Sequence, residues 1–207
     1  MKKTRILVLV IIVFILSMSA FIVVNAISPA KQLGINSTST GNLTKELAVV
    51  GNYVITAQDV VNYKNTLQLQ NIYIEMVGTK VAPAALDEAG ILNHLIENDI
   101  LYLEAEKQGL IVTDTKVDEY LTSMKEYYAK SKDTPEIALI RDFASGKGMS
   151  LNDYLYANKS VYKMLLSIGQ LRSKYLVGIT AYQQQIEKWD QVKADLFQLY
   201  ASDIRMK

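Results

Sequence analysis

The stretch from Ile91 to Gly109 reads ILNHLIENDILYLEAEKQG and predicts a buried helix at the centre of the fold. At about 100° per residue, its apolar side chains fill one half of a helical wheel: Ile91, Leu92, Leu95, Ile96, Ile100, Tyr102 and Leu103. A stripe of this width is typical of a helix that several neighbours cover. Gly109 suits the left-handed end of this helix, and Thr113 suits the N-cap of the next one.

Two polar residues of this central helix require an interpretation. Asp99 lies inside the apolar half of the wheel. Because unpaired buried acids are rare, we favour a carboxylate at the helix edge, paired with Lys or Arg or solvated, over a functional carboxylate. His94, the single histidine of the chain, falls near the polar side and is expected on the surface.

The composition limits the classes of function. The chain has 207 residues, half of them hydrophobic, which is enough for one soluble domain and an export segment. It has no cysteine, which excludes disulfides, thiolate metal sites, a cysteine nucleophile and a lipid-modified cysteine. The first 26 residues carry three bases and no acid, which leaves 19 bases against 21 acids in the rest. A body with a net charge of −2 argues against nucleic acid as a partner.

The N-terminus predicts export. Lys2-Lys3-Thr4-Arg5 is followed by residues 6–24, which carry no charge, and Val24-Asn25-Ala26 resembles a signal-peptidase site. The uncharged run is longer than a typical signal core and approaches a membrane span, so residues 1–26 are either a cleaved signal peptide or a retained membrane anchor. In both cases the rest of the chain is extracytoplasmic. Residues 27–46, rich in Ser, Thr, Asn and Gly, are interpreted as a linker.

Residues 47–55, LAVVGNYVI, predict a short β-hairpin around Gly51-Asn52. Thr56 with Asp59 forms a capping-box pattern that begins a helix ending near Gly78. Asp87 is expected to cap the central helix.

Further helices are expected after Thr113, after Thr134-Pro135 and after Ser150, which has Asp153 three residues later. The helix after Ser150 is predicted to bury Tyr154, Leu155, Val161, Tyr162, Leu165 and Ile168. Thr180 with Gln183 is predicted to cap a last helix within residues 177–207, with Tyr182, Ile186, Trp189, Val192, Leu196 and Leu199 on one side. The fold class is therefore mainly α, with one hairpin and a long C-terminal helix, and the domain covers residues 47–207.

Four segments together resemble the N-terminal domain of SurA-type chaperones. Residues 49–56, VVGNYVIT, resemble the opening "VNGxxIT" of that family. Residues 95–101, LIENDIL, with Ala105 and Gly109, look like its "LIxxxLL…A…G" helix. Residues 112–118 resemble its "VTDxxVD", and residues 151–155 its "EFxxYL" segment. The resemblance covers about residues 49–176, and its strength lies in the order and spacing of motifs that are individually weak.

The resemblance implies an exported holdase that binds unfolded or extended, aromatic-rich polypeptides. Many members carry parvulin-type prolyl isomerase domains, but the residues from Val177 to Lys207 are too few for such a domain. Related chaperones have a C-terminal helix that packs back on the N-terminal domain, which residues 177–207 are expected to do. Related Gram-positive foldases are commonly lipoproteins, whereas this chain has no cysteine. We therefore expect a domain without prolyl isomerase activity.

The patterns that carry catalysis or metal binding are not found in the sequence. One histidine with scattered carboxylates is not a metal-ligand set, and no nucleophile elbow or phosphate-binding glycine loop occurs. No cofactor is expected. The chain does have 13 tyrosines against four Phe and one Trp.

Tyrosines and one methionine cluster in the middle helices and are the candidate peptide-binding residues: Tyr120, Met124, Tyr127, Tyr128, Tyr154, Tyr156 and Tyr162. Such side chains supply contact area at low entropic cost. Most tyrosines of this kind, however, lie at the boundary of a hydrophobic core with the hydroxyl group in water. The leading hypothesis is an ATP-independent chaperone-like domain, membrane-bound through residues 6–24 if these are uncleaved or secreted after cleavage near Ala26. The second is an assembly protein with one dedicated envelope partner. The third is a prolyl isomerase that uses an unfamiliar site.

Overall fold

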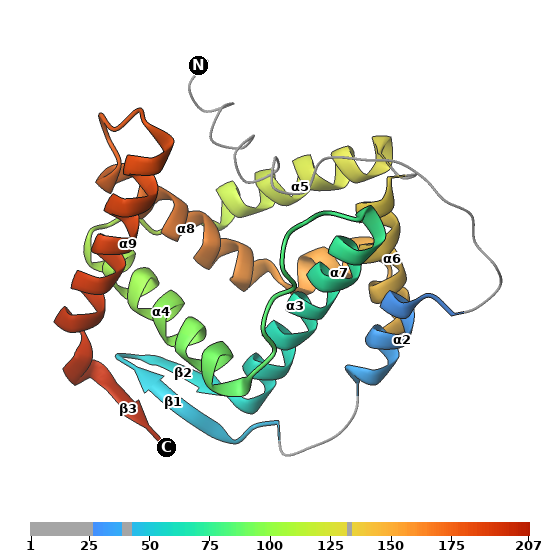
Figure 1. The fold of residues 1–207 in the computed structure, drawn as a ribbon, viewed down its shortest axis with the longest axis horizontal. Helices are drawn as coiled ribbons and strands as arrows, with labels where there is room; N and C mark the ends of the chain where they lie inside the picture. The colour runs from blue at the N-terminus through green and yellow to red at the C-terminus, as the bar shows by residue number, and fades with distance from the viewer. Residues whose placement is uncertain (1–26, 39–42, 132–133) are drawn as a thin grey trace.

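The computed structural model describes residues 27–38, 43–131 and 134–207, and these form a mainly helical fold with one small sheet (Figure 1). The predicted fold class is thereby confirmed. The proposed signal or anchor segment and the cleavage point after Ala26 lie outside the described residues.

The predicted hairpin is present and belongs to a three-stranded sheet. β1 (Glu46–Val50) pairs antiparallel with β2 (Tyr53–Thr56), with Val50 opposite Tyr53. Gly51 adopts φ 55° in the turn, a conformation that residues with a Cβ rarely adopt. On its other side β1 pairs antiparallel with β3 (Ile204–Met206), so the strand order is β2-β1-β3. The strand β3 was not predicted from the sequence.

The first two long helices follow the predicted caps. α3 (Ala57–Val77) begins with the capping box of Thr56 and Asp59 and ends at Gly78 in the left-handed conformation. α4 (Glu88–Lys107) is the central helix; Asp87 caps it, and Gly109 has φ 69° just beyond its end. Its buried face forms the main core with the sheet and the C-terminal helix, where Ile100 is 1% exposed.

The remaining helices complete the fold. They are α5 (Asp114–Lys130), α6 (Pro135–Gly146), α7 (Leu151–Ala157), α8 (Lys159–Tyr175) and α9 (Tyr182–Leu199), which is followed by the 3-10 turn η2 (Ala201–Asp203). As expected, α9 packs back on the domain, because Trp189, Val192 and Leu196 enter the main core. A second core cluster forms where α5 meets α7 and α8.

The interpretation of residues 27–46 as a linker is wrong for its first part. Residues 29–36 form α2 (Pro29–Asn36), which Ser28 caps and which packs on α6 (Figure 1). The two helices pack closely because a glycine from each lies at the contact. A Cβ on Gly34 would overlap the carbonyl oxygen of Phe143, and a Cβ on Gly146 would overlap the carbonyl oxygen of Lys31. Ala30 of the same helix is also buried.

Three expectations for the C-terminal half are also corrected. The helix predicted after Ser150 is two helices, α7 and α8, which meet at Asn158. Val161 and Leu165 were expected in the core but are about half exposed, at 49% and 48%. Thr180 does not cap the last helix.

The last helix begins one residue later than predicted. Its N-cap is Ala181, which has no side chain that can cap. Tyr182 and Leu199, expected on the apolar side, are exposed at the two ends of this helix.

No helix within the described ranges is both long and apolar enough to cross a membrane.

Candidate functional site

Helix α5 is held against α7 and α8 by an apolar contact and two ion pairs. Val117 and Leu121 are fully buried on the inner face of α5 and pack against Leu155. On the rim of this contact, Lys163 lies 2.7 Å from Asp114 and Lys159 lies 2.6 Å from Asp118. The α5 face is therefore fixed relative to α8, and this fixes the tyrosines that flank it.

Most of the clustered tyrosines are partly buried in this contact. The Tyr120 and Tyr162 rings lie 5.9 Å apart, and the ring of Tyr154 meets Phe143 edge-on at 5.7 Å. Burial raises the pKa of Tyr120, Tyr154 and Tyr162. Burial, together with the neighbouring Tyr120, raises the pKa of Tyr128 to about 12. These phenols therefore stay neutral near pH 7 and keep their hydroxyl groups as hydrogen-bond donors.

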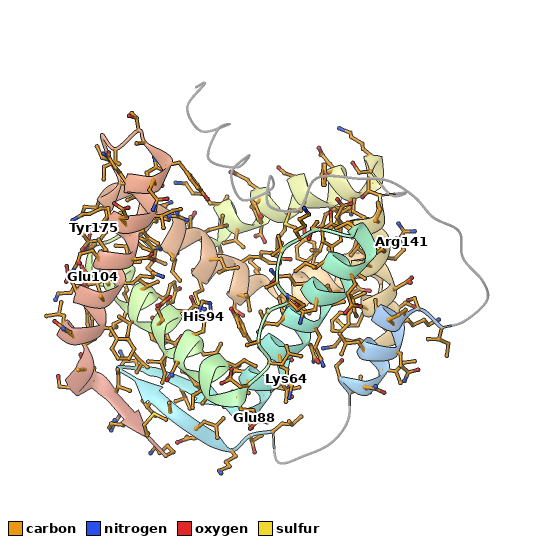
Figure 2. All side chains as sticks on the ribbon, in the orientation of Figure 1. Lys64, Glu88, His94, Glu104, Arg141 and Tyr175 are labelled. Carbon is orange, nitrogen blue, oxygen red and sulfur yellow. The ribbon has the colours of Figure 1, made fainter. Side chains whose placement is uncertain are left out.

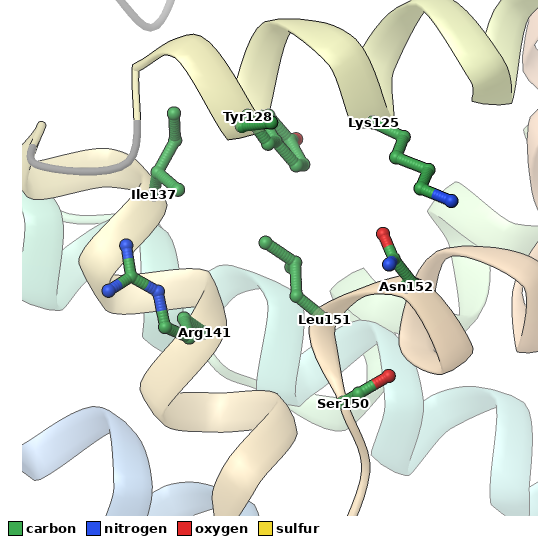
Figure 3. Close-up of a pocket in the computed structure, with 8 residues that line it drawn as sticks. Lys125, Tyr128, Ile137, Arg141, Ser150, Leu151 and Asn152 are labelled. Carbon is green, nitrogen blue, oxygen red and sulfur yellow. The ribbon is translucent and has the colours of Figure 1, made fainter.

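An open pocket of about 250 Å³ lies between the C-terminal part of α5, helix α6 and the start of α7 (Figure 3). The side chains of Tyr128, Ile137 and Leu151 give it an apolar floor. Lys125 and Arg141 flank Leu151 on opposite sides in Figure 3. The other lining residues are Ala129, Ser150 and Asn152.

Local sequence explains how these elements reach the pocket. Pro135 fixes the first turn of α6, and the hydroxyl of Ser150 caps α7 by accepting from the backbone N–H of Asp153 at 3.1 Å. Leu151 is the first residue of α7, and it lines the pocket because α7 begins there. The pocket therefore lies where two helix starts meet the end of a third helix.

Of the predicted peptide-binding residues, Tyr128 alone lines this pocket. Tyr127 lies beside it, with ring centres 5.9 Å apart. Tyr120, Met124 and Tyr162 pack on the second core cluster, Tyr154 packs on Phe143, and Tyr156 is exposed at 44%. The predicted set is thus divided between a core and a surface, and one member reaches a cavity.

Sequence reasoning missed the other pocket residues. Lys125, Tyr128 and Ala129 have the i, i+3, i+4 spacing of one helix face, and Ile137 and Arg141 have the i, i+4 spacing of another. These spacings show that each set shares a face, but they do not show that the two faces meet. The approach of α6 to α5 supplies that information.

The predicted surface position of His94 is confirmed, and that of Asp99 is wrong. His94 is exposed and packs on the ring of Tyr63, with ring centres 5.0 Å apart. Asp99 is only 7% exposed, and among the described residues no ion pair includes it. Burial, together with the carboxylate of Asp59, raises the pKa of Asp99 to about 7. Asp99 is not among the residues that line the pocket between α5, α6 and α7.

A second group of buried polar side chains joins the end of α4 to α8 and α9, at the opposite end of the fold from Arg141 (Figure 2). Glu104 accepts hydrogen bonds from Tyr200 and from Gln108, and Gln108 also donates to Tyr175 at 3.1 Å. These groups are joined by hydrogen bonds, although Gln108 Oε1 has no hydrogen-bond partner among the described residues, and none of them lines the pocket between α5, α6 and α7. Within the described part of the chain, no cluster of His, Asp or Glu is suited to hold a metal ion.

Comparison with known families agrees with this architecture. The model of the family described as "SurA-like N-terminal domain" matches residues 1–154. No curated protein matches the chain. The matched region includes the sheet strands β1 and β2, the central helix, α5, α6 and the first turn of α7.

Proposed function

Because the chain belongs to the SurA-like N-terminal domain family, we propose that it is an extracytoplasmic, ATP-independent chaperone-like domain that binds unfolded or extended polypeptide segments. The observation that carries the proposal is the pocket between α5, α6 and α7, with its apolar floor of Tyr128, Ile137 and Leu151. Apolar side chains that a folded protein buries are exposed in an unfolded chain, and such a floor binds them.

The size of the pocket favours a polypeptide over a small-molecule ligand. Its volume of about 250 Å³ is below the range of roughly 300–1,000 Å³ that is usual for drug-sized ligands and cofactors. A single client side chain fits this space, while the rest of the client remains outside. Binding of this kind is weak and reversible, as a holdase requires.

The walls of the pocket suit clients of varied sequence. Tyr128 offers one ring in the lining and Tyr127, which does not line the pocket, offers a second ring beside it; rigid aromatic side chains bind diverse partners at low entropic cost. Met124, one turn before Tyr128, is partly buried and adds a flexible neighbour. The neutral phenol of Tyr128 can donate to a client carbonyl group.

We also propose that the domain acts without prolyl isomerase activity. This proposal is supported by the structure of residues 155–207, which follow the region that the family model matches. They form the end of α7, α8, α9, η2 and β3, and these pack into the main core and pair with the sheet of the same fold. A protease-coupled assay with a proline peptide is expected to give the uncatalysed rate, and a rate above it would refute this part.

Residues 6–24 would place the domain beside the outer face of a membrane if they are retained. Tethering would raise the local concentration of the pocket near clients that emerge from the membrane. Intact mass of the protein from membrane and medium fractions distinguishes a retained anchor from cleavage near Ala26.

The central experiment is aggregation of an unfolded model client with and without the purified full chain in lipid nanodiscs. We expect suppression at near-stoichiometric ratios, and empty nanodiscs provide the background. Leu151→Glu places a charge on the pocket floor and is expected to abolish suppression. Leu199→Glu, the same change at a 60% exposed position of α9, is the matched control and is expected to leave it intact.

Folded, helical protein that does not delay aggregation would refute the proposal. Capture of one stoichiometric partner from envelope extracts, with no binding of unrelated peptides, would instead support the assembly-protein alternative.

A further inference from the structure

We infer that Asn71 on α3 is a binding site for the backbone of an extended polypeptide, and that residues 81–86 of the chain itself occupy this site until a client displaces them. The inference rests on the proposed function and adds to the pocket a second contact, which the chain itself regulates. It comes from the way in which the segment between α3 and α4 is held.

The side-chain amide of Asn71 makes two hydrogen bonds to the backbone of one residue, Ala84. Its Nδ2 donates to the Ala84 carbonyl oxygen at 3.0 Å, and its Oδ1 accepts from the Ala84 N–H at 2.7 Å. Hydrogen-bonded residues on neighbouring antiparallel strands exchange the same pair of bonds. Because the contact uses only the backbone of the bound residue, it suits a protein whose clients vary in sequence.

The segment that Asn71 holds has the composition of an extended apolar client. Residues 81–86 read VAPAAL, carry no charge and form neither helix nor strand. Val81 is 61% exposed, and Pro83 is exposed as well. The chain therefore presents to Asn71 an uncharged, apolar stretch of the kind that the domain is proposed to bind.

The middle of this segment is held by few contacts. Within the described part of the chain, the two bonds to Asn71 are the only hydrogen bonds that residues 81–86 make. The flanking residues are fixed, because Gly78 closes α3 and Asp87 caps α4. Figure 1 shows the segment leaving the end of α3 and returning to the start of α4. Loss of the two bonds therefore releases the middle while both helices keep their caps.

Residues 81–86 compete with a client at a high effective concentration, because they belong to the same chain. The measured affinity for a client is then the intrinsic affinity multiplied by the fraction of molecules in which Asn71 is uncovered. A substitution that uncovers Asn71 raises this fraction, whereas a substitution that removes the amide of Asn71 destroys the site. The two kinds of change therefore affect client binding differently, although both release the segment.

The test compares two variants that break the same contact from opposite sides. Ala84→Pro removes the N–H group that donates to Asn71 and leaves the amide of Asn71 free for a client. Asn71→Leu keeps a side chain of similar size and removes the amide. Fluorescence anisotropy with the full chain in nanodiscs gives the Kd of a labelled, uncharged peptide of Phe, Val, Ala and Ser. We expect Ala84→Pro to bind the peptide about fivefold tighter than the natural protein, and Asn71→Leu to bind it no tighter.

Matched controls assign the effect to this contact. Ala82→Pro makes the same change at an exposed position of the segment, where the N–H has no hydrogen-bond partner in the described ranges, and should leave the Kd unchanged. Gln70→Leu is the corresponding control at an exposed position of α3. The double variant Asn71→Leu with Ala84→Pro should bind like Asn71→Leu. In the natural protein, saturating peptide should also speed hydrogen exchange over residues 81–86.

Equal effects of Ala84→Pro and Asn71→Leu on the Kd would mean that the contact only holds the segment, and would overturn this inference while the proposed function stands. Hydrogen exchange over residues 81–86 that the peptide leaves unchanged would also overturn it. So would absence of peptide binding in a protein that still delays aggregation. Failure of the natural protein and of every variant to bind the peptide, together with failure to delay aggregation, would reject the proposed function itself.

Discussion

The hydroxyl group of Tyr200 donates a hydrogen bond of 2.6 Å to the carboxylate of Glu104, across the buried contact between the end of α9 and the central helix. Both residues are almost fully buried, at 6% and 7% exposure. Burial, together with the hydrogen bond to Glu104, raises the pKa of the Tyr200 phenol, so it remains a donor at all physiological pH values. This hydrogen bond therefore connects the C-terminal segment, which includes β3, to the central helix.

Tyr200→Phe is therefore expected to lower the free energy of unfolding by about 1–3 kcal/mol, because it leaves a buried carboxylate oxygen without its donor. Urea unfolding followed by circular dichroism measures the loss. Tyr182→Phe removes a hydroxyl from a 68% exposed tyrosine at the start of α9 and is the control. Equal stability of the two variants would show that the Tyr200–Glu104 contact contributes nothing.

Asp99 predicts a pH dependence of stability. Its pKa is raised from an ordinary value of 3.8 to about 7, so the folded state binds the proton more tightly than the unfolded state. The stabilisation from protonation is fully present below about pH 4 and is lost as the pH rises through about 7. The full difference is on the order of 2–4 kcal/mol.

Asp99→Asn keeps the shape of the side chain and removes its charge. We expect this variant to be more stable than the natural protein at pH 8 and to show a flatter stability profile between pH 4 and 7. Chemical denaturation at a series of pH values provides the measurement, with Asp195→Asn on the exposed side of α9 as the control. A profile for Asp99→Asn that parallels the natural protein would contradict the assignment.

The contact between α2 and α6 depends on Gly34 and Gly146, because a side chain at either position would overlap the other helix. Gly34→Ala is expected to destabilise the domain by about 1–3 kcal/mol, because its Cβ would meet the rigid carbonyl group of Phe143. Hydrogen exchange should then show loss of protection over residues 29–36. Gly169→Ala, inside α8 with nothing within 4 Å of an added Cβ, is the control and should stabilise by about 0.5–1 kcal/mol. Unchanged exchange in Gly34→Ala would mean that α2 tolerates displacement.

Features set by neighbouring residues were predictable from the sequence. The hairpin turn at Gly51, the capping box of Thr56 with Asp59 and the left-handed end at Gly109 each depend on a few adjacent positions. The burial of Trp189 also followed from the spacing within its own helix. These signals located most helices but did not show which helices meet.

Features that depend on distant contacts were not predictable. The three residues of β3 carry no strand signal of their own, and they pair with β1 because α9 delivers them there. The helix α2 lies in a stretch whose composition is typical of a linker, and only the close approach of Gly34 to Gly146 accounts for its packing. The same limit applies to the site. The sequence composition identified Tyr128 as a candidate, whereas Lys125 and Arg141 could not be identified as pocket residues without knowing that α5 packs near α6.

The division of the tyrosines gives a final prediction. Tyr128 lines the pocket, whereas Tyr156 is exposed at 44% and does not line it. Tyr128→Ala removes part of the apolar floor and is expected to weaken binding of a Phe-containing peptide by at least about tenfold. Tyr156→Ala is expected to leave the Kd unchanged.

Both variants require a check of folding, because Tyr128 also packs on the second core cluster. Tyr128→Phe, which keeps the ring and removes the hydroxyl, should retain most of the affinity if the ring provides the contact. Tyr162→Ala tests the reverse case, since this residue packs on the cluster without lining the pocket: we expect a lower melting temperature with little change in Kd for the protein that remains folded. A loss of affinity in Tyr156→Ala equal to that in Tyr128→Ala would place the binding surface on the exposed tyrosines instead of in the pocket.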